Sequence, residues 1–93
     1  MLIVNLEAIA AFSKLHADSR GPLQRWVRIT QDAKWNSLAE IRKSFNSADY
    51  KSNQYIFNIK GDDYRLRSSI IFTAQTVMVI DVLTHAEYSK LRL

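Results

Sequence analysis

The first part of the chain carries apolar residues with the spacing of a strand and then of a helix. Residues 1–4 form a short apolar run, which predicts a buried first strand. From Leu6 onward, apolar side chains recur every three or four residues, which predicts an amphipathic helix ending before the polar segment 17–21.

Two further helices are expected before residue 46. Pro22 marks the start of the second, because its fixed φ and missing N–H are tolerated in a first helical turn. The third is predicted to begin after Asn36 or Ser37. Residues 46–53 are rich in Ser, Asn and Asp, and this composition predicts a loop.

After residue 53 the apolar period changes to two, which is typical of strands. Three strands rich in aromatic and β-branched residues are predicted, joined by two turns. The strands cover residues 54–60, 64–72 and 77–83, and the turns are Gly61-Asp62 and 73–76. Helices followed by an antiparallel meander predict an α+β fold with the helices on one face of a small sheet.

The first hairpin decides which side chains share a face of that sheet. A loop at Gly61-Asp62 pairs Arg65 with Asn58, and a loop one residue later pairs it with Lys60. Either loop separates polar from apolar side chains, whereas a three-residue loop would mix charges into the core. The polar face then holds Asn58, Lys60, Arg65 and Arg67.

The second hairpin and a capping motif bring a further segment to Arg65. A turn of two or four residues before Val77 would set Arg65 opposite Thr84. Thr84 and Glu87 have the spacing of a capping box, so a short C-terminal helix is predicted to start at His85, with Tyr88 about one turn later. Free amides at this helix start would favour a phosphate, and an uncharged imidazole there can accept a proton.

Composition narrows the kinds of protein that the chain can be. With 93 residues, 47% of them hydrophobic, we expect one domain, residues 1–93, with one core. The absence of cysteine excludes disulfides and thiolate chemistry, and the distance between His16 and His85 argues against a metal site. Without a signal or membrane segment, we expect a cytoplasmic protein that needs no cofactor. A net charge of +4 favours an anionic partner such as nucleic acid.

A set of short motifs occurs in order along nearly the whole chain. They are Pro22-Leu23 with Trp26, Ala33 to Trp35, Phe45 with Ala48-Asp49, Phe57 to Gly61, Tyr64 to Leu66, and Thr84-His85 with Glu87-Tyr88. In this combination the chain resembles the enterobacterial branch of the HigB toxins. It departs from the usual family pattern at Asp62, which replaces a common asparagine, at Arg67, which replaces an aliphatic residue, and at Ser89, which replaces an aspartate.

The resemblance implies a RelE-like fold and a toxin of a type II toxin–antitoxin pair that cuts messenger RNA in the ribosomal A site. It also implies a helix-turn-helix antitoxin of the HigA type, with operator DNA bound only through that antitoxin. The residues carried over by motif are Lys60, Arg65, His85 and Tyr88. A non-catalytic toxin or a plain RNA-binding module on the same scaffold is the alternative interpretation.

Cleavage of RNA without a metal needs charge stabilisation on the phosphorane and two proton transfers. Arg65 suits the first task, because its planar fork can bind two phosphate oxygens. His85 and Tyr88 are assigned the proton transfers, and Lys60 is a phosphate clamp or an alternative base. Which group acts as acid and which as base stays open.

Other residues are predicted to contact RNA or to lie in the core. Asn58, Arg67 and Lys90 are predicted RNA contacts, although Arg67 could instead pair with Asp81. The two tryptophans, Trp26 and Trp35, are expected in the core.

Overall fold

The computed structural model describes residues 1–92, and it confirms the predicted α+β class. The elements are β1 (Leu2–Val4), α1 (Leu6–Leu15), the 3₁₀ turn η1 (Ala17–Ser19), α2 (Arg20–Asp32), α3 (Leu38–Ser44), β2 (Asp49–Lys51), β3 (Gln54–Ile59), β4 (Tyr64–Ile71), β5 (Thr76–Thr84) and α4 (His85–Ser89). Helix α2 begins two residues before Pro22, so the proline lies inside the first turn, where its missing N–H costs no hydrogen bond. In the described part of the chain, no helix combines the length and apolar character needed to cross a membrane.

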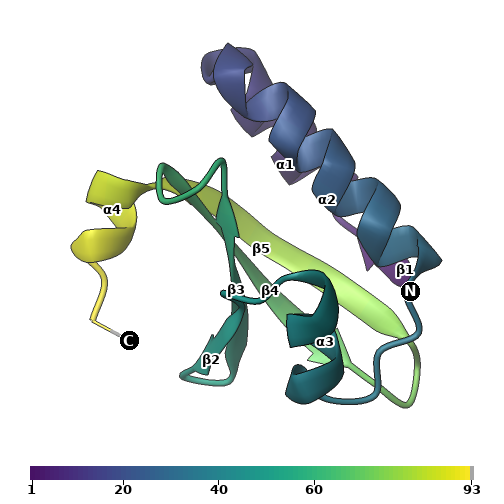
Figure 1. Ribbon diagram of the computed structural model, residues 1–93. Coiled ribbons are helices and arrows are strands. Elements are labelled where there is room, and N and C mark those ends of the chain that lie inside the picture. The colour runs from purple at the N-terminus through teal and green to yellow at the C-terminus, as the bar shows by residue number, and fades with distance from the viewer. Residues whose placement is uncertain (93) are drawn as a thin grey trace.

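The strands form one sheet in the order β1-β5-β4-β3-β2. Strand β1 runs parallel to β5, and the other neighbours are antiparallel. Helices α1 and α2 lie side by side over one face of the sheet, as expected, and α4 follows β5 at the end far from β1 (Figure 1). At that far end, α4 lies against the connection between β3 and β4.

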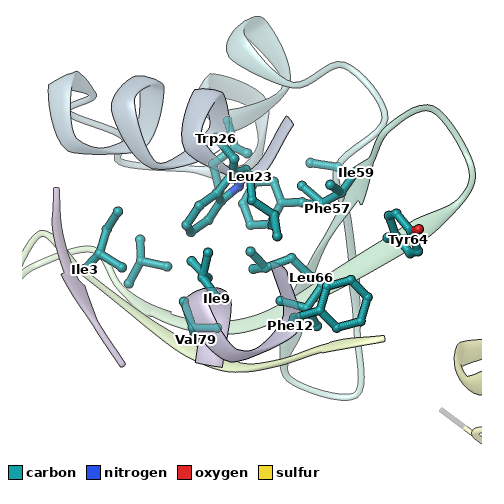
Figure 2. Close-up of a cluster of buried hydrophobic side chains, with 14 of the residues drawn as sticks. Ile3, Ile9, Phe12, Leu23, Trp26, Phe57, Ile59, Tyr64, Leu66 and Val79 are labelled. Carbon is teal, nitrogen blue, oxygen red and sulfur yellow. The ribbon is translucent and has the colours of Figure 1, made fainter. Parts of the chain in front are cut away.

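The core lies between this helix pair and the sheet, and it is built around aromatic side chains (Figure 2). Trp26 and Trp35 are 1% and 3% exposed, which confirms their predicted place in the core. Both rings pack on Phe57, with centroids 5.3 Å and 6.1 Å away. Truncating Trp26 to Ala would leave a cavity that neighbouring atoms cannot fill, and this would cost about 3–5 kcal/mol of stability.

The predicted loop over residues 46–53 is partly wrong, because it contains strand β2. Asp49 pairs with Ile56 and Lys51 with Gln54, through a turn at Ser52-Asn53. Both turn residues have positive φ, 51° and 63°, as a two-residue hairpin turn requires. Strand β2 has three residues, two of them charged, and lies at the sheet edge, so it gives almost no alternating apolar signal.

The predicted pairing of Arg65 with Thr84 is wrong by one residue. Arg65 lies opposite Leu83, and Thr84 lies opposite Tyr64. Two departures from the predicted register combine. Ile71 pairs with Thr76, so the hairpin starts two residues short of the predicted register, and a β-bulge between the pairs Ser68–Val79 and Arg67–Asp81, with Ile80 as the extra residue, gives one residue back.

Candidate functional site

The β3–β4 turn, residues Lys60–Asp63, supports the site. Asn58 lies opposite Arg65, which confirms the register predicted for a loop at Gly61-Asp62. The backbone N–H of Asp63 donates to the carbonyl oxygen of Lys60 at 3.2 Å. Lys60 and Gly61 both have positive φ, 53° and 62°, and glycine adopts this conformation without strain.

Arg65 is held beneath this turn with only 11% of its side chain exposed. Its Nη1 donates to the carbonyl oxygens of Asp62 at 2.9 Å and Tyr64 at 3.2 Å, and its Nη2 lies 2.7 Å from the Asp62 carboxylate. The guanidinium carbon also lies 5.4 Å from the centroid of the Tyr88 ring, within cation–π distance. These contacts offset the cost of withdrawing the charge from water and fix the direction of the fork.

Helix α4 is docked onto the same turn. Its capping box is complete, as predicted: Thr84 accepts from the Glu87 N–H at 3.1 Å and donates its own N–H to the Glu87 carboxylate at 2.9 Å. Hydrogen bonding of the Glu87 carboxylate to the Thr84 backbone N–H, and next to the Thr84 side chain, lowers the pKa of Glu87. The backbone N–H of His85 donates to the carbonyl oxygen of Asp63 at 2.9 Å.

The helix start is therefore not the open phosphate cradle that the sequence suggested. The amides of His85 and Glu87 both bind acceptors within the protein, because the cap and the turn already use them. These two amides are therefore not available to an anion.

The imidazole of His85 is oriented by the turn as well. Its Nδ1 lies 3.1 Å from the carbonyl oxygen of Asp62. A carbonyl oxygen only accepts, so Nδ1 carries the proton in this hydrogen bond, and Nε2 is the acceptor of the neutral ring.

Arg65, His85 and Tyr88 line one cavity of about 260 Å³, here called the Arg65 pocket. The predicted convergence of these three side chains is confirmed. Lys51, Ser89 and Leu91 complete the lining. The sequence pattern does not reveal Lys51, because its segment has the composition of a loop. In the structure, pairing with Gln54 places Lys51 on the same sheet face as Arg65.

The predicted position of Lys60 on that face is wrong. Its ammonium lies 2.8 Å from Asp18 and 3.4 Å from Asp63, on the helix side of the turn, and it does not line the Arg65 pocket. These carboxylates, Asp18 foremost, raise the pKa of Lys60, so the group stays protonated and is unsuited to be a base. The reason is conformational: β3 ends at Ile59, and the positive φ of Lys60 breaks the alternation from which its face was inferred.

The three predicted RNA contacts lie in different surroundings. Arg67 binds Asp81 through two hydrogen bonds of 2.8 Å and 2.6 Å, which confirms the alternative interpretation and raises the pKa of Arg67. Asn58 lines a separate groove beside the turn. Lys90 is exposed just after α4 and does not line the Arg65 pocket. Across residues 1–92, no three His, Asp or Glu side chains gather in a way that could hold a metal ion.

Comparison with known proteins assigns this arrangement to a family. The HigB toxin model, described as the RelE-like toxic component of a toxin–antitoxin system, matches residues 19–91. The chain belongs to the HigB toxin family. The matched segment includes every residue that lines the Arg65 pocket, and the helices packed on a five-stranded sheet agree with a RelE-like fold.

Curated relatives in this family share part of the sequence. The chain is 31% identical over 52 residues to the mRNA interferase toxin HigB of Escherichia coli K12. The proteins named mRNA interferase HigB of E. coli O157:H7 and Shigella flexneri match equally well. Each match covers 56% of this chain and 50% of the relative, so the chain spans about half the length of the curated relatives it matches.

Proposed function

We propose that the chain is an endoribonuclease toxin that cuts messenger RNA on the ribosome by metal-independent acid–base chemistry. The observation that carries the proposal is the Arg65 pocket, where a nearly buried guanidinium faces a small cavity together with an imidazole and a phenol. The names of the curated relatives, mRNA interferases, support the same activity.

The proposed reaction divides its tasks among three side chains. The ribose 2′-oxygen attacks phosphorus, its proton passes to one of the pair His85 and Tyr88, and the departing 5′-oxygen takes a proton from the other. Arg65 binds the non-bridging oxygens while charge builds on them. Losing one such donor costs about 3 kcal/mol in comparable sites, and proton transfer contributes roughly 100- to 10,000-fold in rate.

The cation assignments follow the geometry of the pocket. Lys51, which lines the pocket and has only a loose 3.9 Å contact with Asp49, is proposed to hold a flanking phosphate. Lys60 receives no role at the scissile phosphate, because Asp18 and Asp63 hold its ammonium elsewhere.

The proposed partners follow from the proposed activity and from the family. Messenger RNA and the ribosome are the targets, in the cytoplasm. A helix-turn-helix antitoxin of the HigA type would neutralise the toxin and provide its only link to operator DNA.

Primer extension on transcripts after induction tests the proposal. The wild-type chain should arrest growth and create new 5′ ends within codons. Arg65→Ala should do neither, while keeping its circular dichroism spectrum and antitoxin binding; Arg28→Ala, which removes an exposed arginine outside the pocket, is the control. Growth arrest without new 5′ ends would instead support the non-catalytic toxin. Wild-type cleavage by Arg65→Ala would remove Arg65 from the mechanism.

A further inference from the structure

A larger hollow, here called the Asn58 groove, opens beside β3. Its volume is about 510 Å³, compared with about 260 Å³ for the Arg65 pocket. The groove lies between the first half of α2, the connection from α3 to β2, and the end of β3. It exists because the three-residue β2 covers β3 only as far as Ile56, which leaves the last part of the β3 edge unpaired.

The charges around the groove have one sign. None of its lining residues is acidic. Arg25 and Lys43 lie on its rim, and neither is in an ion pair with any residue in the 1–92 range. By contrast, the third cation of the lining, Lys60, is already neutralised by carboxylates. Arg25 and Lys43 are therefore free to bind an anion.

The remaining lining suits a nucleotide more than a simple ion. Asn46, Ser47 and Asn58 add neutral donors and acceptors, and the half-buried Pro22 and Phe45 contribute apolar surface. Apolar surface next to cations and amides can bind a nucleobase and its phosphate at the same time.

The groove and the Arg65 pocket are neighbours through one pair of residues. Asn58 lines the groove and lies directly opposite Arg65 in the β3–β4 ladder. Opposed residues of an antiparallel pair have Cα atoms about 5 Å apart and side chains on one face. The groove itself opens toward the helices, where Trp26 and Lys60 line it, so a strand of RNA bound at Arg65 would reach the groove by passing around the unpaired edge of β3 at Asn58.

We infer that the Asn58 groove binds the length of RNA that adjoins the scissile phosphate, with Arg25 and Lys43 holding its phosphodiester groups. The inference rests on the proposed function, because it takes the scissile phosphate to lie at Arg65. It assigns to this groove a role in RNA affinity and in the length of RNA that the protein recognises.

Binding of uncleavable, 2′-O-methylated RNA to the full chain tests this role. The double variant Arg25→Ala/Lys43→Ala is compared with Arg28→Ala/Lys34→Ala, which removes the same two charge types from exposed positions outside the groove. Fluorescence anisotropy is measured over a range of salt concentrations with a dinucleotide and with an RNA of about twelve nucleotides.

We expect the groove variant to bind the longer RNA roughly tenfold more weakly at low salt and the dinucleotide as well as wild type. Losing two phosphate contacts should also reduce the slope of log affinity against log salt by about 1.4. The control variant should change affinity by less than about twofold.

Three results would overturn the inference. Equal losses in the two double variants would indicate general electrostatic attraction, and unchanged RNA affinity in the groove variant would exclude a contact. Weakened antitoxin binding with unchanged RNA binding would identify a protein surface instead. Because the RNA is uncleavable, failure of the proposed nuclease activity is seen separately, in the primer-extension experiment.

Discussion

Two arginines on one face of β4 show how a structural cation differs from one that can bind a ligand. Arg65 and Arg67 are almost equally buried, with 11% and 15% of the side chain exposed. Arg67 is held at two of its three guanidinium nitrogens, Nε and Nη2, by Asp81, a residue of the neighbouring strand. Arg65 has one carboxylate oxygen from Asp62, whose side chain is 74% exposed on a turn. Burial alone therefore does not distinguish the two roles; the partner and the adjoining cavity do.

The bulge in β5 creates this difference. If this sequence continued in the register of Ser68 and Val79 without a bulge, Asp81 would lie opposite Leu66, on the core face. The bulge moves Asp81 to the outer face and aligns it with Arg67. This one-residue change of register lets Asp81 neutralise Arg67, whereas Arg65 has the β3–β4 turn as its partner and lines the pocket.

The largest expected effect is a difference in RNA cleavage rate between variants of Arg65 and of Arg67. Arg65→Lys keeps the charge but loses the planar fork, so we expect single-turnover RNA cleavage to slow roughly 100-fold. Arg67→Lys should change cleavage by less than about threefold, because Arg67 contacts Asp81 and not the pocket. The cleavage rate of both variants on ribosome-bound message is the measurement. Similar losses in the two variants would show that the distinction drawn from their partners is wrong.

The same comparison shows which features a sequence reveals. The three long strands and the capping box are visible because period-two alternation and the Thr84–Glu87 spacing are local patterns. The bulge at Ile80 is not, because register depends on the summed pairing of two whole strands. The direction of Lys60 was also hidden, since its positive φ ends an alternation that the pattern continues.

A smaller effect is expected where Asp62 competes with substrate for Arg65. The Asp62 carboxylate lies 2.7 Å from Nη2 of Arg65 and places a negative charge beside any phosphate that Arg65 binds, so Asp62→Asn should strengthen binding of an uncleavable dinucleotide by roughly three- to tenfold. The matched control is Asp63→Asn, which removes a charge from the same turn without touching Arg65. Weaker binding by Asp62→Asn would mean that the carboxylate positions Arg65 and does not compete.

The smallest effect concerns the carboxylate that holds the turn from the helix side. Asp18 accepts hydrogen bonds from Lys60 at 2.8 Å and from the Tyr64 hydroxyl at 2.5 Å, and these lower the pKa of Asp18 below 3.8. A lowered folded-state pKa stabilises the fold above the unfolded value, and this stabilisation is lost as the pH falls through the folded value. The pKa values of Lys60 and Tyr64 are raised, chiefly by the hydrogen bond to Asp18, so their contributions are lost only as the pH rises above about 10.

Asp18→Asn should therefore lower the urea midpoint of unfolding by a small, constant amount between about pH 4 and pH 10, and the difference from wild type should vanish in stronger acid. Asp32→Asn, at an exposed position at the end of α2, is the control and should show no such plateau. RNA cleavage by Asp18→Asn should stay close to wild type, because Arg65 and His85 are bound by the turn's own carbonyl oxygens and not by Asp18. A difference in stability that grows toward acid pH would show that Asp18 is strained in the folded state. The contacts of Asp18 with Lys60 and Tyr64 would then not stabilise the helix side of the turn.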